Sequence, residues 1–496
     1  MKRELPVGSL VWLLFAAVLA IRLVVAFQTN YFTYDSYFHV RQVESIAHTG
    51  MPVFDDPLSQ GGRAYFFSPV FHYIFALFTL AIPIEIIGKI LPNILYALLI
   101  PLSYYIALRI NENRNSALFS SLFVALFPGM WSTINSFDPL CIIIPAIFFI
   151  FYCLIRIDEK KYLTWFTASS AIAAVISPIS LVIIPALWLF VLLLKIEKTE
   201  ERGAVIESII FSTFLMLLVQ FLVYKKALLI HGYSIIWQNI PAVILNDFFK
   251  ELTVLDVIVS VGIIAFIFGV YEVYRFSFTK KERELSAIIS LAIVAAFLLW
   301  TKLVEFETGM AILGVSLAII SSKTIGSIRE YLQKIKINFS FKHAGIAIII
   351  LLLITTIPAS FGVVKNLMDN MPNGPEMDAM LWIRDNSADS STIIASPEEG
   401  FLINAVALRK NVIDNNFLMI TDAETRYNDV KEVYKTSFET NAVQILNKYR
   451  AKYILLSKSV TEEFGVTGLS YADLKCFKKF YENNETAIFK TWCDVK

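Results

Sequence analysis

Long apolar segments dominate the chain and limit most strongly the folds that it can adopt. Of its 496 residues, 56% are hydrophobic and only 17% are charged, whereas soluble proteins carry about 25% charged residues. A helix that crosses a bilayer needs about 20 mostly apolar residues. Such runs predict spanning helices near residues 7–27, 90–109, 116–130, 139–156, 162–178, 181–195, 204–223, 253–274, 285–301, 308–322 and 343–363. We therefore expect a polytopic α-helical membrane domain.

One further apolar run, residues 69–84, leaves the number of crossings open. Either this run lies at the membrane interface or re-enters, or the region contains two extra crossings, so the total is about 11 or 13. The first run ends without a small-residue cleavage pattern. We interpret it as a retained helix, with a cleaved signal peptide as the alternative.

Charge is distributed unevenly along the chain. From Lys365 onward about one residue in four is charged, against about one in seven before it. This difference predicts two domains, a transmembrane domain over residues 1–364 and a small soluble α/β domain over residues 365–496. The net charge of +1 offers no basic surface for DNA or RNA, which excludes nucleic acid as a partner.

The basic residues of the predicted loops indicate an orientation. Loops rich in Lys and Arg stay in the cytoplasm. Every second loop is basic if the N-terminus is cytoplasmic, and these loops contain Arg109, Arg114, Arg156, Lys160, Lys161, Lys195, Arg275 and Lys323. We expect a multi-pass protein of the cell membrane with a cytoplasmic N-terminus and an extracytoplasmic C-terminal domain.

The predicted outer loops contain two acids that are well placed for chemistry. Asp35 follows the first helix, and Asp138 begins a helix that runs inward. Hard divalent cations prefer oxygen ligands, so two carboxylates at one membrane face favour a site for Mg²⁺ or Mn²⁺. An acid at a helix N-terminus is also stabilised by the helix dipole, so the alternative role of Asp138 is a helix cap.

His39 and Arg41 follow Asp35 in the same loop. The guanidinium group of arginine is a planar fork of donors that suits phosphate. We assign both side chains to binding the phosphates of a lipid-linked donor. A solvated surface charge is the alternative for Arg41.

Three segments carry a family resemblance. They read TYDSYFHVRQ after the first helix, FPGMWSTINSFDPL before the helix at 139–156, and MDAMLWIRDNSADSSTIIASPEEGFLINAVALRKNVIDNNF in the polar domain. This arrangement resembles the catalytic subunit of oligosaccharyltransferase in its single-subunit archaeal and bacterial form, which belongs to the C superfamily of membrane glycosyltransferases. The resemblance covers the whole chain and implies that fold.

The resemblance also implies roles for individual residues. Asp35 matches the acid that binds the metal and helps to activate the acceptor asparagine amide, and Asp138 matches the first acid of the second loop. Glu398 keeps an acid within the segment that reads the acceptor, and Glu399 lies beside it. Both glutamates are therefore assigned to acceptor binding.

Several family positions are substituted. Leu140 replaces the second acid of the second loop, and Gln238 replaces the glutamate that usually lies three residues before a proline. The family motif Trp-Trp-Asp-Tyr-Gly corresponds to Ser396–Gly400, which lacks both indoles. Fold does not imply function when the site is altered, so glycosylation of asparagine does not follow from the resemblance.

These observations predict a membrane glycosyltransferase similar to oligosaccharyltransferase. It would transfer a sugar or oligosaccharide from a polyprenyl or dolichyl phosphate or pyrophosphate carrier to an acceptor protein or glycan on the outer membrane face. Two alternatives remain open. One is a transferase of the same superfamily that uses a lipid-monophosphate sugar and a non-protein acceptor, and the other is a catalytically inactive paralogue that binds lipid-linked glycan.

The polar domain shows alternating short strands and helices. Apolar residues at helical spacing predict a helix over 440–448, and short apolar runs predict strands at 392–395, 412–414 and 453–457. A hairpin that pairs residue 482 with 487 would bring Cys476 opposite Cys493. We expect a disulfide there, with two free thiols as the alternative.

Overall fold

The computed structural model describes residues 7–198, 203–249, 253–278, 282–334, 341–472 and 475–493. The chain forms two compact units, and neither is continuous in sequence. The first, which we call the helical unit, contains residues 1–30, 86–222 and 249–369. The second, which we call the α/β unit, contains residues 31–85, 223–248 and 370–496. The predicted boundary at residue 365 lies near the last of these breaks.

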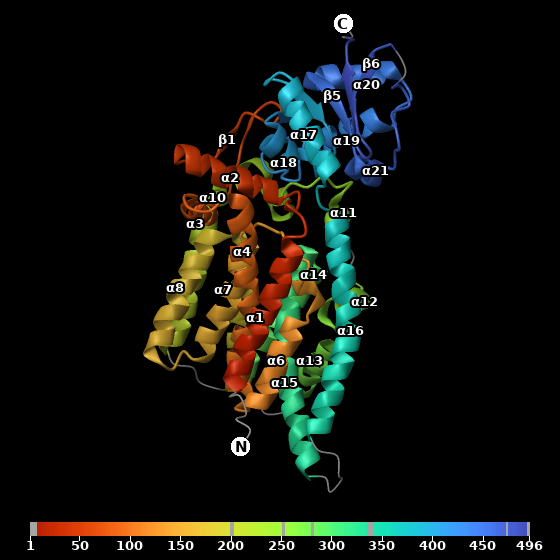
Figure 1. Ribbon diagram of the computed structural model, residues 1–496. Coiled ribbons are helices and arrows are strands. Elements are labelled where there is room, and N and C mark those ends of the chain that lie inside the picture. The colour runs from red at the N-terminus through yellow and green to blue at the C-terminus, as the bar shows by residue number, and fades with distance from the viewer. Residues whose placement is uncertain are drawn as a thin grey trace. The chain divides into compact units, whose positions relative to one another are not determined.

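The helical unit consists of long apolar helices, and Figure 1 shows α1, α15 and α16 running along a common direction. Its helices are α1 (Val7–Ala26), α4 (Ile84–Ala97), α5 (Leu99–Asn111), α6 (Arg114–Ala125), α7 (Leu140–Ile155), α8 (Lys160–Ile176), α9 (Ile183–Ile196), α12 (Val254–Val261), α13 (Ile263–Phe276), α14 (Arg283–Trp300), α15 (Phe306–Lys334) and α16 (Phe341–Asp369). The long helix α10 (Gly203–His231) continues from this unit into the α/β unit.

Helix α15 is the packing centre of the helical unit and contacts α5, α6, α13 and α14. Small residues allow this close approach. A Cβ on Gly314 would lie 2.5 Å from the ring of Phe127, and one on Gly309 would lie 2.4 Å from Leu299. Small residues at helix contacts are typical of membrane bundles, because lipid gives no hydrophobic drive to helix association and tight packing replaces it.

Seven of the described helical segments are long and apolar enough to cross a membrane, and the number is eight if α12 and α13, bent by 111° at Gly262, form one span. The predicted spans at 116–130, 139–156 and 162–178 correspond to α6, α7 and α8, which have 12, 16 and 17 residues. The run at 69–84 forms only the ten-residue helix α3 (Val70–Thr79), which is too short to cross. The chain is a multi-pass membrane protein, as the sequence predicts.

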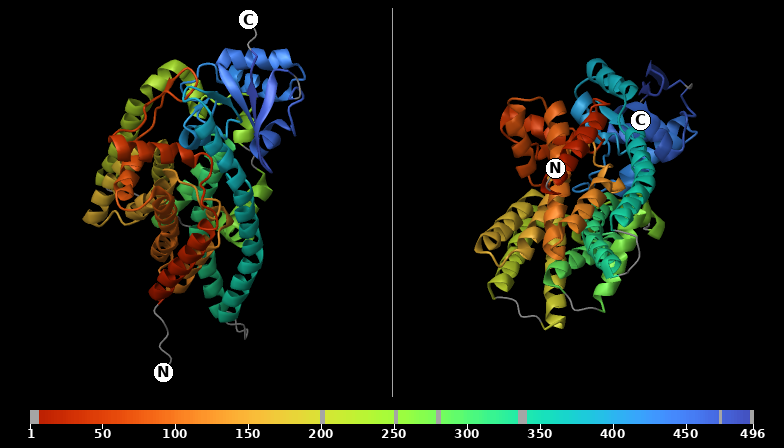
Figure 2. Two further views of the ribbon diagram at one scale, coloured as in Figure 1. Left: turned by 45° about the horizontal axis from the view of Figure 1, so that its top comes forward. Right: turned by 60° about the horizontal axis from the view of Figure 1, so that its bottom comes forward.

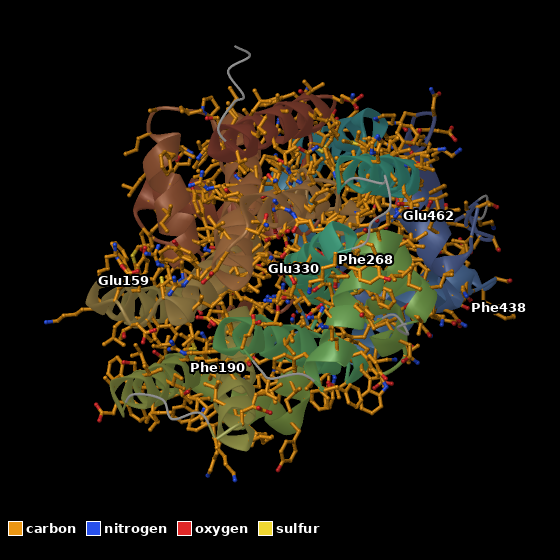
Figure 3. The ribbon with its side chains drawn as sticks, turned by 90° about the horizontal axis from the view of Figure 1, so that it is seen from below. Glu159, Phe190, Phe268, Glu330, Phe438 and Glu462 are labelled. Atoms are coloured by element: carbon orange, nitrogen blue, oxygen red, sulfur yellow. A yellow bond between two sulfur atoms is a disulfide. The ribbon has the colours of Figure 1, made fainter. Side chains whose placement is uncertain are left out.

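Charged residues of the helical unit pair with one another at helix ends. Glu159, labelled in Figure 3, lies at the edge of the bundle just before α8. It forms an ion pair with Arg156, with 2.5 Å between the carboxylate oxygen and the guanidinium nitrogen. Arg283 at the start of α14 pairs with Asp158 at 2.8 Å. Interactions of this kind are expected where helices leave the apolar region. They do not assign a side of the membrane, so the cytoplasmic N-terminus stays a prediction.

The α/β unit is built around a five-stranded sheet of order β4-β3-β5-β7-β6. Strands β4 (Lys410–Asn411), β3 (Thr392–Ile394) and β5 (Ala451–Leu456) are parallel, and β7 (Ala487–Thr491) and β6 (Phe477–Glu482) are antiparallel additions. Figure 2 (left) shows these strands with helices beside them. The helices are α17 (Gly374–Asn386), α18 (Gly400–Leu402) with the π-helical turn η4 (Ile403–Ala407), α19 (Ala423–Lys435), α20 (Glu439–Tyr449) and α21 (Lys458–Phe464).

The predicted elements of this domain are largely confirmed. Strands β3 and β5 and helix α20 lie where apolar patterning places them. The strand expected at 412–414 is wrong, because β4 ends at Asn411 and residues 412–414 form a loop. Val412 and Ile413 are nevertheless buried, so their apolar character reports burial in a loop and not strand pairing.

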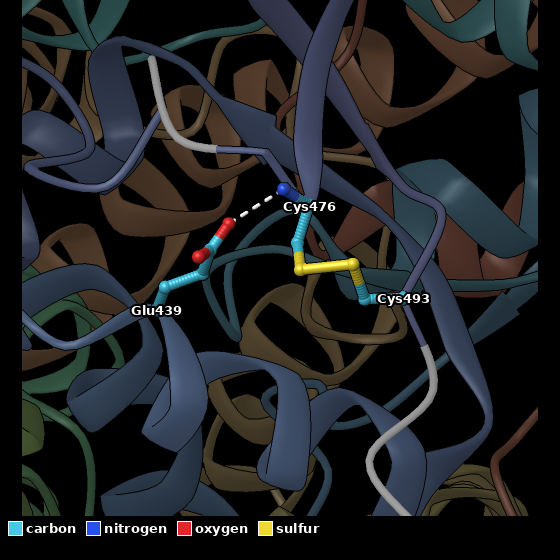
Figure 4. Close-up of a disulfide and its surroundings, with 3 residues drawn as sticks. All are labelled: Glu439, Cys476 and Cys493. Carbon is cyan, nitrogen blue, oxygen red and sulfur yellow. Dashed lines mark hydrogen bonds between the residues drawn. A yellow bond between two sulfur atoms is a disulfide. The ribbon is translucent and has the colours of Figure 1, made fainter.

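The C-terminal hairpin contains the expected disulfide (Figure 4). Cys476 and Cys493 are bonded, with 5.1 Å between their Cα atoms, and the backbone N–H of Cys476 donates to Glu439 at 2.6 Å. The predicted pairing of Glu482 with Ala487 is correct, but the register shifts between Lys479 and Tyr481. The backbone N–H of Trp492 donates to the carbonyl of Cys476, so Trp492 and not Cys493 lies directly opposite Cys476 in the hairpin.

Residues 31–85, which include the predicted loop after the first helix, and residues 223–248 also belong to the α/β unit. They form α2 (Ser36–Thr49), the short antiparallel pair β1 (Asp55–Asp56) and β2 (Arg63–Ala64), α3, the 3-10 turn η3 (Gly232–Trp237) and α11 (Leu245–Phe248). The backbone of residues 58–60 bonds to Asn411 in β4. The predicted first outer loop is thus an integral part of the unit that contains the sheet.

Candidate functional site

Asp35 lies at the N-cap position of α2 and is exposed, while its neighbours Tyr34 and Ser36 are buried. Aspartate at an N-cap usually accepts a backbone N–H of the first helical turn. The Asp35 side chain makes no such capping bond. Its Oδ1 instead accepts a hydrogen bond of 3.1 Å from the side-chain amide of Asn415.

Asn415 belongs to a turn that is fixed from both sides. Asp414 is fully buried and forms an ion pair with Arg63, whose side chain is 2% exposed. Asp414 Oδ1 accepts the backbone N–H of Asn416 at 3.0 Å, and Arg63 donates to the Asn416 carbonyl. Asn411 donates to the other oxygen of Asp414 at 3.0 Å. This network joins β2 to the turn at 414–416.

Gly400 allows the motif segment to approach this turn closely. A Cβ at Gly400 would lie 2.4 Å from the Cβ of Asp414 and 2.5 Å from the carbonyl of Ile413. No other residue type fits without displacing backbone, so the glycine that ends Ser396–Gly400 has a steric role. It holds the start of α18 against the Asp414 turn.

Arg41 forms an ion pair of 2.6 Å with the buried carboxylate of Asp56, and its own side chain is 14% exposed. Tyr65 donates to the other Asp56 oxygen at 3.0 Å. Burial alone would raise the pKa of Asp56, but the hydrogen bond and the charge of Arg41 outweigh it and lower that pKa. Arg41 is therefore held in place, and its assigned role in phosphate binding stays a prediction.

His39 is partly buried and shares a hydrogen bond of 2.8 Å with His72 of α3. The rings of Phe38 and Phe71 lie against it. Burial lowers the pKa of His39 to about 3, so the imidazole is neutral near pH 7. A neutral ring binds phosphate by hydrogen bonding and not by charge, and this role also stays a prediction.

Glu398 is partly buried and accepts a hydrogen bond of 2.9 Å from the hydroxyl of Ser459. Burial raises its pKa to about 7. Ser459 also shares a hydrogen bond of 2.8 Å with Ser396. The carboxyl group at the motif's acid position thus accepts a hydroxyl of its own chain, and its assigned role in acceptor binding stays a prediction.

Glu399 lies in the interior with no exposed surface. Its Oε2 accepts from the backbone N–H and the hydroxyl of Ser396, at 3.1 and 2.9 Å. Glu376 of α17 is buried nearby and accepts from Tyr34 at 2.7 Å. Burial, together with the neighbouring carboxylate in the case of Glu376, raises the pKa of both acids. Glu399 holds the motif segment in its fold and has no surface to offer to an acceptor, so its assigned role in acceptor binding stays a prediction without support from its burial.

Asp138 belongs to the helical unit and makes local bonds. Its Oδ1 accepts the backbone N–H of Leu140 at 2.7 Å, and its Oδ2 accepts the hydroxyl of Ser136 at 2.5 Å. Asp138 therefore caps α7, the alternative role that the sequence left open. Each oxygen keeps a second lone pair, so the cap does not preclude a ligand role.

The loop before Asp138 is fixed by a buried arginine of α1. Arg22 has no exposed surface. Its Nε donates to Asn93 at 2.8 Å, one terminal nitrogen donates to the carbonyl of Met130, and the other donates to the hydroxyl of Thr133 at 2.8 Å. A membrane arginine is thus satisfied by neutral oxygen atoms. We infer that Arg22 positions residues 130–133.

Two residues that support the segment after Asn415 were missed by sequence reasoning. Asn239 donates to the carbonyls of Phe417 and Ile420 at 3.0 and 2.8 Å, and His231 accepts the backbone N–H of Met419 at 2.8 Å. These contacts support the segment that follows Asn415. Gln238, the neighbour of Asn239, and the family segment that ends in residues 414–417 were named from the sequence, but neither Asn239 nor His231 was assigned a role.

Among the described residues, no group of three or more His, Cys, Asp or Glu side chains is arranged to hold a metal ion. The two assigned ligands, Asp35 and Asp138, belong to different units. Binding of Mg²⁺ or Mn²⁺ stays a prediction.

Comparisons with known proteins identify the fold. Neither a protein-family model nor a curated protein sequence matches the chain. The archaeal oligosaccharyltransferase AglB from Archaeoglobus fulgidus, in complex with an inhibitory peptide and a dolichol-phosphate, matches with a TM-score of 0.63 and 13% identity over 90% of this chain and 70% of AglB. A second structure of the Archaeoglobus fulgidus oligosaccharyltransferase, in complex with Zn and sulfate, gives 0.62 and 13% over 96% and 73%.

A second kind of transferase also matches. ArnT from Cupriavidus metallidurans, bound to undecaprenyl phosphate, gives a TM-score of 0.58 and 11% identity over 96% of this chain and 97% of ArnT. At these identities the likeness concerns the fold. The chain has the fold of the C superfamily of membrane glycosyltransferases, as its resemblance to oligosaccharyltransferase predicts.

Proposed function

We propose that this protein is a membrane glycosyltransferase that takes a sugar or oligosaccharide from a polyprenyl or dolichyl phosphate or pyrophosphate carrier. The acceptor is a protein or a glycan on the outer membrane face. The observation that carries this proposal is Asp35, an exposed carboxylate that does not cap its helix and is held by a distant side chain. The structures with the same fold, bound to dolichol-phosphate and undecaprenyl phosphate, support the donor class.

The proposed reaction joins an acceptor nucleophile to the anomeric carbon of the sugar. The bond between that carbon and the phosphate oxygen breaks, and the phosphate leaves with the bonding electrons. The acceptor gives up a proton, and we assign its capture to the Asp35 carboxylate as general base. Asp35 also orients the acceptor group through hydrogen bonding.

Glu398 is the side chain that we assign to acceptor recognition. Its partial exposure and its bond to the Ser459 hydroxyl suit it to accept a hydrogen bond from an acceptor hydroxyl. Because its pKa is about 7, the ionised form that accepts such a bond gains population as the pH rises through 7. We assign His39 and Arg41 to binding the phosphates of the donor. These phosphates would compete with the Asp56 carboxylate for the guanidinium group of Arg41.

The decisive test is Asp35→Ala in a membrane assay with lipid-linked sugar. Loss of the base and of the acceptor contact should lower the transfer rate by about 10²- to 10⁴-fold. Asp55→Ala is the matched control, because Asp55 is an exposed acid of the same loop segment. Full activity of Asp35→Ala, or equal losses in both variants, would contradict the mechanism.

One observation favours a second candidate, a transferase of the same superfamily that uses a lipid-monophosphate sugar, a non-protein acceptor and one carboxylate. Both oxygens of Asp138 already accept hydrogen bonds, one from the backbone N–H of Leu140 and one from the hydroxyl of Ser136, and Leu140 occupies the place of the second acid. Chelation separates the candidates. Transfer that is lost with chelator and restored by Mn²⁺ supports the metal-dependent reaction, and transfer that persists supports the second candidate.

A further inference from the structure

We infer that Asn415 is a positioning residue for Asp35, and this inference rests on the proposed function of Asp35. The two side chains lie 380 positions apart in the sequence, yet both belong to the α/β unit. The Asn415 amide donates to Asp35 Oδ1 at 3.1 Å. Asn415 would act through Asp35 and not on the substrate.

The geometry at Asp35 requires an explanation that helix capping does not give. An aspartate at an N-cap ordinarily turns its carboxylate toward the first helical turn. Asp35 makes no capping bond, and a tertiary donor bonds to it instead. The bond to Asn415 therefore restrains the orientation of an exposed carboxylate.

Asn415 is suited to this role because its backbone is anchored. The residue before it, Asp414, is buried against Arg63 and Asn411, and the residue after it, Asn416, donates its N–H back to Asp414. The following segment is supported by Asn239. Because the backbone of this turn is held on both sides, the side-chain amide of Asn415 has a defined position.

A carboxamide is also the right chemical type for the task. It donates a hydrogen bond to a carboxylate without supplying a positive charge. A lysine or arginine in its place would offset the negative charge that a general base needs. Asparagine thus fixes the direction of the carboxylate and leaves its charge intact.

The test compares three substitutions by their effect on kcat and on KM for the lipid-linked sugar. Asn415→Ala should lower kcat about tenfold, the effect of one hydrogen bond of ordinary strength, with little change in KM. Asn415→Asp keeps the shape but replaces a donor by a second carboxylate, so it should be worse than alanine. Asn415→Gln keeps the donor and should recover part of the lost rate. Asn441→Asp, at an exposed position on α20, is the matched control.

The order of the variants distinguishes positioning from packing. If Asn415 only fills space, aspartate should be tolerated better than alanine because it is nearly isosteric. That order, or unchanged kcat in Asn415→Ala, would overturn the inference.

A second measurement needs no substrate. If Asp35 and Asn415 interact, the Tm losses of Asp35→Ala and Asn415→Ala should not add in the double variant, because both remove the same bond. Additive losses would overturn the contact. If the wild-type protein transfers no sugar, the proposed function fails, and this cycle still decides whether Asn415 holds Asp35.

Discussion

A buried arginine of the helical unit, Arg22, and a buried arginine of the α/β unit, Arg63, are stabilised in different ways. Arg22 in the helical unit has no exposed surface and donates to an amide oxygen, a carbonyl and a hydroxyl, all of them neutral. Arg63 in the α/β unit is almost as deeply buried and pairs with the carboxylate of Asp414. All three guanidinium nitrogens of Arg22 donate hydrogen bonds, whereas Arg63 donates from its two terminal nitrogens, and only the second arrangement places two opposite charges in the interior.

The difference shows what each arginine joins. Arg22 binds the carbonyl of Met130 and the hydroxyl of Thr133, so it holds the loop at residues 130–133 against α1. Arg63 joins β2 to the turn at 414–416, across a sequence separation of 351 residues. Removal of one partner should therefore cost more in the α/β unit, because a buried charge left alone is less favourable than a buried carbonyl left alone.

The largest expected effect is that of Arg63→Met. The substitution leaves the Asp414 carboxylate buried without its cation, which should lower the free energy of unfolding by about 4 kcal/mol. Thermal unfolding in detergent, followed by hydrogen exchange in peptides of each unit, measures the loss. Arg41→Met is the control, since Arg41 is 14% exposed and should cost less. Equal losses would show that burial does not set the strength of these pairs.

A smaller effect concerns the pH dependence of the α/β unit. The pKa of Glu398 is raised by burial from 4.5 to about 7, so the folded state holds this proton more tightly than the unfolded state. Its contribution to stability is complete below about pH 4.5 and is lost as the pH rises through 7, up to about 3 kcal/mol.

Glu398→Gln removes this contribution, and the buried acids Glu376 and Glu399 retain theirs, which has the same sign. Unfolding curves at pH 5 and pH 8 should therefore differ more for the wild type than for Glu398→Gln. A variant whose pH dependence equals that of the wild type would show that Glu398 titrates normally in the folded protein.

The smallest of the three effects is expected for Arg22→Met. Thr133 still donates to the Met130 carbonyl at 2.9 Å after the arginine is removed, so fewer groups lose their partner. We expect a loss of about 2 kcal/mol, measured in peptides of the helical unit in the same exchange experiment. A loss larger than that of Arg63→Met would reverse the comparison between the units.

Local elements of the fold could be predicted where the pattern of apolar residues reports on nearby structure. The helix at 440–448 was found because its apolar residues recur at helical spacing, and the strand at 453–457 was found because it is a short apolar run. The strand at 412–414 was mispredicted because Val412 and Ile413 are buried in a loop. The register shift between Lys479 and Tyr481 left no mark in the sequence, since a bulge changes pairing without changing alternation.

The candidate site was predicted in part. Asp35 and Glu398 were named because their residue types and family positions suggested chemistry, and the structure gives each a specific partner, Asn415 and Ser459. Those partners were not predictable from spacing, because they lie in other segments of the chain. The capping role of Asp138 was foreseen, since a cap depends on residues two positions away.

The sequence by itself determined that the chain is a multi-pass membrane protein with a polar C-terminal part, because hydrophobicity and charge are properties of composition. It also determined the local helices, strands and caps, which depend on neighbours along the chain. Only the tertiary structure decided that the first loop belongs with the sheet, that Arg63 meets Asp414, and that Asn415 holds Asp35. These contacts join residues more than 300 positions apart, and packing of the whole unit, not any local pattern, brings them together.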